Sequence, residues 1–152
     1  MILADTNILL RLTRSDADEY PLIKAALKRL RREGIPLCYT SQNLIEFWRV
    51  LTRPKTENGF GLPVEAADHE AKLIETRLDF LPDTPAVHEH WRRLVVEYRV
   101  SGRQVHDARL VAVMLAHGIL RLLTLNVGDF ERYGSLIAPV HPRELAQDVE
   151  AR

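Results

Sequence analysis

The 152-residue chain has a single cysteine, no net charge and no long apolar run. Cys38 alone cannot form an internal disulfide, and so sparse a use of cysteine suits a reducing compartment, so we expect the cytosol. No apolar stretch approaches the ~18–20 residues that a membrane span needs. The best candidate, residues 111–125, is interrupted by His117, Gly118 and Arg121. The N-terminal segment has no basic leader and carries an acid within its apolar stretch, so we expect no signal peptide.

The composition is typical of one globular domain, which we expect to span residues 1–152. Apolar residues make up 46% of the chain and charged residues 28%, which argues against intrinsic disorder and a coiled coil. The charges are unevenly distributed, since residues 63–90 hold two basic and seven acidic side chains, whereas residues 91–109 hold five basic and two acidic. We therefore expect local basic patches rather than strong non-specific binding to nucleic acid.

Short apolar runs alternate with helical patterns along the chain. Strands are expected at residues 2–4, 37–39, 122–125 and 136–140, because each run is apolar and too short for a helix. Apolar residues recur at helical spacing in five segments, which we expect to form helices at about 15 or 16 to 32, 41–54, 63–78, 84–102 and 106–118. In the second segment Ser41 is the expected N-cap, and in the third Pro63 is the expected first position. This alternation predicts an α/β fold, a parallel sheet covered by helices on both faces.

Four acids fall where ligands bind in such a sheet, beyond the carboxyl ends of the strands. Asp5 directly follows the first strand, and Glu46 lies inside the helix after the second. Asp129 follows the strand at 122–125, and Asp107 stands at the start of a helix. Asp107 shares a helical face with the apolar residues at 110, 111 and 114, so we expect its carboxylate to point along a buried stripe.

Each acid also has a purely structural interpretation. Three of them could cap a helix or a turn, and Glu46 could form a surface ion pair with Arg49 or Arg53. These interpretations do not explain why all four acids fall near one edge of the sheet. Two carboxylates about 4 Å apart repel by ~4 kcal/mol at an effective dielectric of about 20, so a cluster needs protons or a cation. Oxygen donors without Cys or His at ligand spacing favour Mg²⁺ or Mn²⁺ over Zn²⁺, and such ions act on phosphates.

Four segments resemble motifs of the PIN-domain ribonucleases, and in particular of the VapC-type toxins of toxin–antitoxin pairs. They are LADTNILLRL (3–12), PLCYTSQNLIEFWRVLTRP (36–54), VHDARLVAVMLAHG (105–118) and LLTLNVGDF (122–130). A tail at residues 137–145 resembles the family's last strand, so the resemblance covers nearly the whole chain. It implies a PIN-like three-layer α/β/α fold with a short central parallel sheet.

The resemblance assigns a role to each of the acids. Asp5 and Asp107 match the main metal ligands, and Glu46 matches the second acid of the site. Family members often carry an acid at the third place of the final motif, where this chain has Asn126. Asp129, three residues later, is the nearest carboxylate that could supply the missing charge. Asn126 and Asp129 therefore remain alternatives for the fourth position.

Further polar residues match supporting positions of the family. Thr6 and Asn7 lie next to Asp5, and Thr40 and Ser41 introduce the helix that carries Glu46. With Asn126, these residues would position the acids rather than carry the reaction.

The implied activity is that of a Mg²⁺- or Mn²⁺-dependent endoribonuclease. Hydrolysis of an RNA phosphodiester would leave a 5′-phosphate and a 3′-hydroxyl, and a single-stranded loop is the expected substrate because splayed bases are easiest to read. The family further implies a cognate antitoxin protein that inhibits the enzyme, a homodimer and a cytoplasmic location. Trp48 and Trp91 have the spacing of core residues rather than of a base-stacking surface. Candidate contacts to phosphate are Arg49, Arg53, Lys55, Arg99, Arg103 and Arg109.

Two other classes of function compete with this interpretation. A Mg²⁺-dependent phosphatase of the haloacid-dehalogenase type also has an Asp after its first strand, but it needs a second acid two residues later, where this chain has Asn7. A non-catalytic module that binds RNA or a protein partner would use the acids only as helix caps, and it would not bind Mn²⁺.

Overall fold

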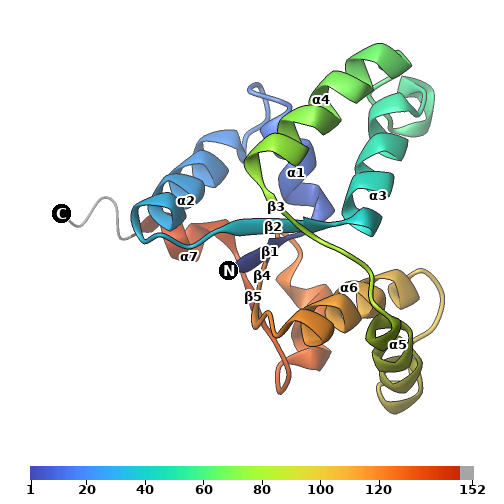
Figure 1. Cartoon of the computed structure of the whole chain (residues 1–152). Helices are drawn as coiled ribbons and strands as arrows, with labels where there is room; N and C mark the ends of the chain where they lie inside the picture. Colours follow the sequence, from blue (N-terminus) through green and yellow to red (C-terminus); the bar gives the residue numbers. More distant parts are fainter. Residues whose placement is uncertain (148–152) are drawn as a thin grey trace.

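A five-stranded parallel sheet lies at the centre of the computed structural model, which describes residues 1–147 (Figure 1). The last five residues of the expected domain lie outside the described part. The strand order is β3-β2-β1-β4-β5, and every neighbouring pair is parallel. The strands are β1 (Ile2–Ala4), β2 (Leu37–Thr40), β3 (Asp79–Leu81), β4 (Arg121–Leu123) and β5 (Ala138–Val140).

Helices cover both faces of this sheet, which gives the three layers expected from the sequence (Figure 1). One face is covered by α1 (Thr6–Leu12), α2 (Tyr20–Arg32), α3 (Ser41–Thr52), α4 (Val64–Arg77) and α7 (Pro142–Ala146), with a 3-10 turn η1 (Lys55–Glu57). The other face is covered by α5 (Pro85–Glu97), α6 (Gln104–His117) and the 3-10 segment η2 (Val127–Tyr133). Within residues 1–147, no helix is long and apolar enough to cross a membrane.

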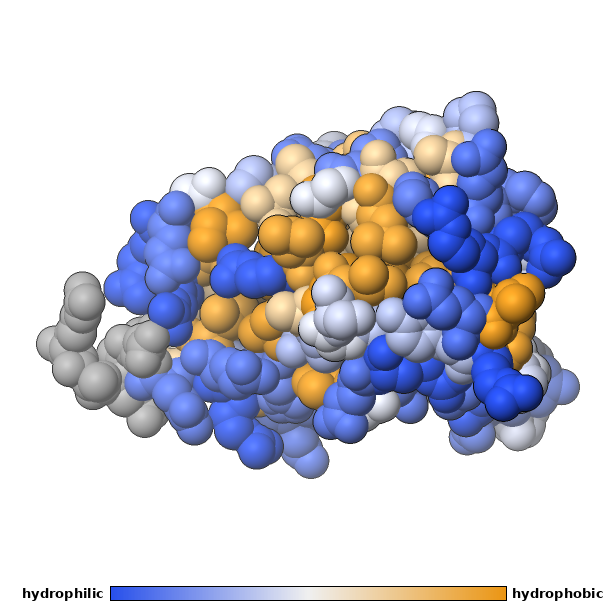
Figure 2. Space-filling view, turned by 90° about the horizontal axis from the view of Figure 1, so that it is seen from below, coloured by the Kyte–Doolittle hydropathy of each residue, from blue (hydrophilic) through white to orange (hydrophobic). Residues whose placement is uncertain are grey.

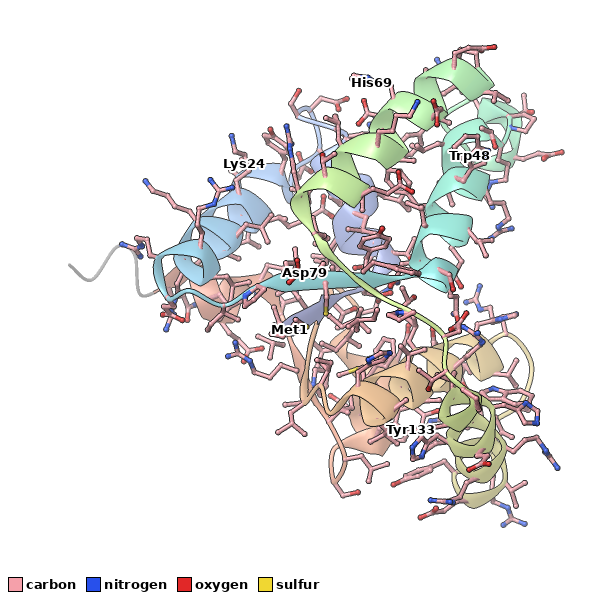
Figure 3. All side chains as sticks on the ribbon, in the orientation of Figure 1. Met1, Lys24, Trp48, His69, Asp79 and Tyr133 are labelled. Atoms are coloured by element: carbon pink, nitrogen blue, oxygen red, sulfur yellow. The ribbon has the colours of Figure 1, made fainter. Side chains whose placement is uncertain are left out.

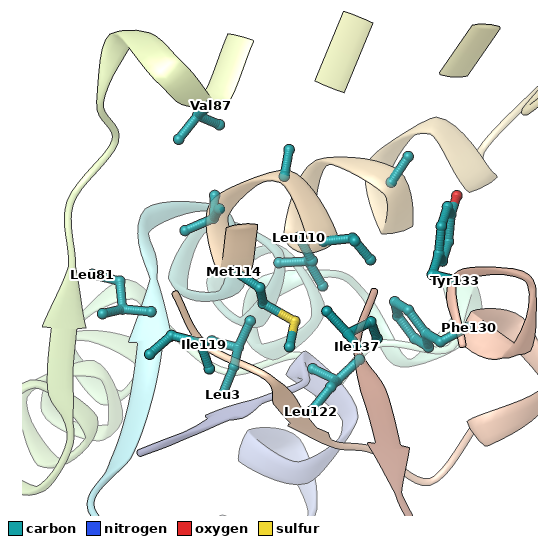
Figure 4. Packing of buried hydrophobic residues seen from close by; sticks show 14 of the residues in the cluster. Leu3, Leu81, Val87, Leu110, Met114, Ile119, Leu122, Phe130, Tyr133 and Ile137 are labelled. Atoms are coloured by element: carbon teal, nitrogen blue, oxygen red, sulfur yellow. The ribbon is translucent and has the colours of Figure 1, made fainter. Parts of the chain in front are cut away.

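Two hydrophobic cores lie on the two faces of the sheet. Because successive side chains of a strand point to opposite faces, Leu3 packs under α6 while Ile2 and Ala4 pack under α1 and α2. In the core under α6, Leu110, Met114, Leu122, Phe130 and Tyr133 pack together (Figure 4). Seen from the side of α5 and α6, hydrophobic residues also gather in the middle of the surface, with hydrophilic residues around them (Figure 2).

Several expected helix starts are wrong by a few residues. The helix expected from residue 15 or 16 begins at Tyr20, because the Ser- and Asp-rich stretch before it forms turns. Ser41 is the first residue of α3, and Thr40 is its N-cap, whose side chain accepts a hydrogen bond from the backbone N–H of Asn43. Pro63 is likewise the N-cap of α4 rather than its first position.

The helix that carries Asp107 also starts earlier than expected, at Gln104. Asp107 therefore lies at the end of the first turn of α6, and capping does not account for it. Gly118 ends this helix as expected, in the left-handed conformation (φ 67°) that glycine adopts without a steric penalty.

The strand β3 is missing from the sequence-based prediction. It has only three residues, Asp79, Phe80 and Leu81, of which only Leu81 is buried, so it shows neither an apolar run nor a clear alternation. β3 forms at the edge of the sheet through parallel pairing with β2, which places Asp79 opposite Cys38. The expected strands at 122–125 and 136–140 are shorter than predicted, as β4 and β5.

Candidate functional site

The first acid, Asp5, lies where β1 ends and α1 begins. It is the N-cap of α1, and its Oδ1 accepts a hydrogen bond from the backbone N–H of Thr6 at 2.7 Å. Its Oδ2 accepts hydrogen bonds from Thr124 Oγ1 at 2.7 Å and from Asn7 Nδ2 at 3.2 Å. The backbone N–H of Asp5 donates to Leu123 O at 2.9 Å, which ties the acid to β4. The capping interpretation is thus correct for Asp5, but it accounts for only one of its two oxygens.

The electrostatics of Asp5 are those of a buried acid among other acids. Burial raises the pKa of its carboxyl above the usual range, and the hydrogen bonds from Thr124 and Thr6 oppose that increase. The negative charges of Glu46 and Asp129 raise the pKa further. Asp5 therefore lies close enough to both acids to be affected by their charge.

Glu46 is half-buried on α3, and both of its carboxylate oxygens accept hydrogen bonds. Thr6 Oγ1 donates to Oε2 and Gln42 Nε2 donates to Oε1, each at 3.0 Å. Asn43 Nδ2 in turn donates to Thr6 Oγ1 at 3.2 Å. Thr6 therefore links Glu46 to the helix start that Asp5 caps. The carboxylate of Glu46 is held by Thr6 and Gln42, and the expected pairing with an arginine of its own helix is not needed to explain it.

Asp107 is half-buried in the first turn of α6. Burial raises the pKa of its carboxyl to about 6, and the charges of Asp5, Asp129 and Glu46 contribute in that order. The positive charge of Arg103 opposes the increase. The charges of the three other acids predicted from the sequence therefore all act on Asp107, although the four acids come from four separate segments.

Asn126 and Asp129, the two candidates for the fourth position of the site, have different surroundings. Asn126 is the N-cap of η2 but makes no capping hydrogen bond with its side chain, and its backbone N–H donates to Thr124 Oγ1 at 3.0 Å. Asp129 is exposed in the first turn of η2, and its charge raises the pKa of both Asp5 and Asp107. Asp129 thus supplies negative charge to the cluster from a position three residues after the expected one.

The acid cluster fits a hard divalent cation in its chemistry. Within residues 1–147, no three Asp, Glu, His or Cys side chains stand close enough together to hold a metal ion as they are. Burial raises the pKa of Asp5 and of Asp107, and the charges of neighbouring acids raise both pKa values further. Mg²⁺ keeps several of its waters and needs only one or two direct carboxylates, so a set of oxygen donors suits it.

The supporting residues contribute in two different ways. Asn7 contacts the site directly, because Nδ2 donates to Asp5 and Oδ1 accepts from the backbone N–H of Leu125 at 3.2 Å. Thr40 fixes the start of α3 through a capping box with Asn43. Ser41 does not contact the four acids, and its hydroxyl donates to Asp83 Oδ2 at 2.8 Å.

Three residues of the site were not predicted as functional: Thr124, Gln42 and Asn43. Thr124 is fully buried and donates to the buried oxygen of Asp5. Gln42 lies one turn before Glu46 and bridges it to the backbone O of His106. The position of Thr124 immediately after a strand, and the i, i+4 spacing of Gln42 and Glu46, are the signals that could have identified them.

The basic residues near the site are only partly available to a substrate. Arg109 donates to Asp83 at 3.0 Å and to Gln42 Oε1 at 3.3 Å. Arg53 donates to the backbone O of Asn58 at 3.0 Å. Arg103 is exposed and acts on Asp107 by charge. The other candidates, Arg49, Lys55 and Arg99, are exposed.

Both tryptophans pack against the cores, as their spacing predicts. Trp48, on α3, and Tyr133, at the end of η2, lie on opposite sides of the sheet (Figure 3). Trp91 is half-buried on α5, where its Nε1 donates to Val105 O at 2.9 Å.

Comparison with known proteins gives a consistent result over most of the chain. The family model of the PIN domain matches residues 2–136. Ribonuclease VapC24 of Mycobacterium tuberculosis is 28% identical over 140 residues, which cover 88% of this chain and 92% of that protein.

Solved structures resemble the fold at low sequence identity. The VapBC2 complex of Rickettsia felis, bound to a DNA fragment from its promoter, matches with a TM-score of 0.70 and 19% identity, over 93% of this chain and 98% of that chain. VapC20 of Mycobacterium tuberculosis, a toxin that cleaves the sarcin–ricin loop, matches with a TM-score of 0.64 and 20% identity, over 92% and 98% of the two chains.

Proposed function

The chain belongs to the PIN-domain family, and from this premise we propose that residues 1–152 form one PIN domain that acts as a Mg²⁺- or Mn²⁺-dependent endoribonuclease, the toxin of a toxin–antitoxin pair. One observation carries the proposal. Asp5 and Asp107 come from segments about a hundred residues apart, yet the charge of Asp5 helps to raise the pKa of Asp107. Such repulsion is relieved either by a proton or by a cation, and a divalent cation would relieve it at neutral pH.

In this proposal Asp5 and Asp107 hold the cation, and Glu46 and Asp129 complete the negative charge around it. Bound Mg²⁺ or Mn²⁺ would polarise the phosphate and activate a water molecule for hydrolysis. The hydrogen bond from Thr124 keeps one oxygen of Asp5 fixed. This leaves the carboxylates preorganised, so that less reorganisation is needed when the substrate binds.

RNA would reach the acids along the basic residues around the start of α6. Arg103 is exposed and lies close enough to Asp107 to affect its ionisation, so it suits a phosphate next to the cleaved bond. Arg99 is exposed at the turn before α6. Because the chain has no net charge, contacts with the RNA should be few, and a single-stranded loop suits a short binding track.

A cleavage assay with Asp5→Asn tests the proposal. A fluorescently labelled RNA stem–loop is incubated with the protein in Mn²⁺, in EDTA, and in EDTA followed by excess Mn²⁺. We expect cleavage with Mn²⁺, none in EDTA, recovery after the metal is restored, and none with Asp5→Asn. Asp79→Asn is the matched control, because Asp79 is an exposed acid on the edge strand β3, and it should cleave like the wild type. Cleavage by Asp5→Asn would rule out this site.

The competing phosphatase interpretation requires a general acid at position 7, and the chain has an asparagine there. Its general acid would stand where Asn7 stands, and Asn7 donates a hydrogen bond to Asp5 and accepts one from the backbone. An amide so held cannot give a proton to a leaving group. A non-catalytic module would bind no Mn²⁺, so calorimetric titration of the wild type against Asp5→Asn separates it from an enzyme.

A cognate antitoxin is the proposed protein partner. Several solved relatives of the same fold are toxin–antitoxin complexes. A groove of about 1090 Å³ between α2 and α4 could bind a segment of this antitoxin. The groove is lined by the apolar residues Leu27, Leu30 and Leu73 and by the basic residues Lys24 and Lys28. That combination suits an amphipathic segment with an apolar face and acidic flanks.

Two experiments address the partner and the assembly. The product of an adjacent reading frame is added to the cleavage assay, where an antitoxin should suppress cleavage at a one-to-one ratio and a non-partner should not. Sedimentation of the purified chain tests the proposed homodimer, for which the apolar area in Figure 2 is a candidate contact surface. Fractionation of the producing cells tests the proposed cytoplasmic location.

A further inference from the structure

A second hollow, of about 340 Å³, lies beside the acid cluster between the start of α5 and the start of α6. Its volume is within the range of roughly 300–1,000 Å³ of small-molecule pockets. The residues that matter to the argument are Asp83, Thr84, His88, Trp91, His106 and Arg109. None of these is one of the four acids, but His106 and Arg109 lie beside Asp107 on α6.

The wall of this pocket is joined to the acid cluster through Gln42. Gln42 Nε2 donates to the backbone O of His106 at 2.8 Å and to Glu46 Oε1 at 3.0 Å. Arg109 Nη1 donates to Gln42 Oε1 at 3.3 Å. His106 also immediately precedes Asp107 in the chain. A group bound in the pocket therefore lies next to any phosphate held at the acids.

Two aromatic rings form one side of the pocket. The rings of His88 and Trp91 have centroids 6.2 Å apart and are tilted by 41°. Trp91 packs partly against the core, as its spacing predicts, but it also lines the pocket, where its hydrogen bond to Val105 O anchors it. His88 is exposed. Flat rings of this kind stack on the faces of unpaired nucleobases, and stacking tolerates any base.

The pocket is also lined by a carboxylate that two donors hold in place. Asp83 accepts a hydrogen bond from Ser41 at Oδ2 and pairs with Arg109 at Oδ1. An ionised carboxylate has about four lone-pair sites, so these two donors leave acceptor capacity for a ligand. Thr84 adds a hydroxyl that makes no capping hydrogen bond to α5. A base with neighbouring N–H donors on its Watson–Crick edge suits this acceptor, and guanine has two of them.

We propose that this pocket binds an unpaired nucleobase, preferentially guanine, of the RNA strand whose phosphate lies at the acids. The base would stack on His88 and Trp91 and donate hydrogen bonds to Asp83. This inference rests on the proposed ribonuclease function and adds to it the feature that selects the cleavage position. A neighbouring base held in this way fixes the register of the strand, because the acids themselves contact only the backbone.

Base preference in cleavage is the first test. Short single-stranded RNAs that differ in one base at each position are cleaved in Mn²⁺, and the rate is followed as a function of base and position. We expect the wild type to favour guanine at one fixed distance from the cut. Because the ring would hold the base with its donor edge toward Asp83, His88→Ala should reduce that preference about tenfold, which is within the range for the loss of one stacked base. His88→Phe should retain it, and so should Glu89→Ala, which removes an exposed neighbour outside the pocket.

Two results of this assay would overturn the inference. One is an unchanged base preference in His88→Ala. The other is an equal loss of rate on all RNAs, which would mean that the ring only supports the fold. Asp83→Asn gives an independent reading, because an amide both donates and accepts and should shift the preference away from guanine while cleavage of other sequences continues.

Fluorescence of Trp91 separates this inference from the proposed function. In a Trp48→Phe background Trp91 is the only tryptophan, and it is titrated with guanine-containing and uracil-containing tetraribonucleotides without divalent cation. We expect stronger quenching by the guanine-containing oligomer, lost in His88→Ala. If no RNA is cleaved but this quenching occurs, the pocket stands and the nuclease proposal fails. Cleavage without any quenching overturns the pocket, as it would if a side chain of a protein partner were the natural occupant.

Discussion

Replacement of Asp107 by Asn should stabilise the metal-free protein at neutral pH while it abolishes cleavage. The carboxyl of Asp107 has its pKa raised from 3.8 to about 6 by burial and by the three other acids. A raised pKa means that the folded state binds the proton more tightly than the unfolded state. Ionisation of Asp107 therefore destabilises the fold as pH rises from about 4 to about 6, and the full cost remains at higher pH.

The size of the effect follows from the shift. A shift of about two units corresponds to about 3 kcal/mol at pH 7 as an upper bound. Asp107 is only half-buried, so solvent screening reduces this to ~1–2 kcal/mol. For a chain of this length the melting temperature of Asp107→Asn should then exceed that of the wild type by roughly 2–8 °C at pH 7. At pH 4, close to the pKa of 3.8 of the unfolded state, most of the difference should be gone, and it should vanish at still lower pH.

Thermal unfolding in EDTA from pH 4 to 8 measures this difference, with Asp79→Asn as the control for loss of one negative charge elsewhere. Adding Mn²⁺ at pH 7 should raise the melting temperature of the wild type and leave that of Asp107→Asn nearly unchanged, because only the complete site binds the cation. A wild type and variant that differ equally at pH 4 and pH 7 would refute the reasoning, since the stabilisation would then not come from the charge.

Three further predictions concern the same edge of the sheet and its core. Asp129→Asn should weaken Mn²⁺ binding and slow cleavage, whereas Asn126→Asp should strengthen Mn²⁺ binding. Calorimetric titration of both variants decides which residue fills the fourth position, and an unchanged Mn²⁺ affinity in Asp129→Asn would remove Asp129 from the site. Thr124→Val removes the hydroxyl that donates to Asp5 and should lower Mn²⁺ affinity about tenfold, whereas Thr124→Ser retains it. Burial raises the pKa of the Cys38 thiol to about 12, so at pH 8 a thiol reagent should label it only after unfolding; fast labelling of the native protein would contradict this burial.

Local signals in the sequence determine most of the sheet and the helices around it. The apolar run at 2–4 forms β1 because a short run of this kind gains most by burial on both faces, and Gly118 ends α6 because it adopts a positive φ. The position of Asp5 at the end of β1 also follows from the sequence, whereas Glu46 and Asp107 lie inside helices. Parallel strands end at the same edge of a sheet, so residues just after them meet wherever the strands pair.

The tertiary structure alone decides which side chains hold these acids and what completes the sheet. The hydrogen bond from Thr124 to Asp5 joins residues 119 positions apart, and the one from Thr6 to Glu46 joins residues 40 apart. No local pattern encodes either, because a hydroxyl selects its partner only after both chain segments are in place. Residues 79–81 form the strand β3 only because they pair with the free edge of β2. The charge of Asp129 acts on Asp107 only because η2 packs against α6 and β5, so its contribution depends on packing rather than on its place in a motif.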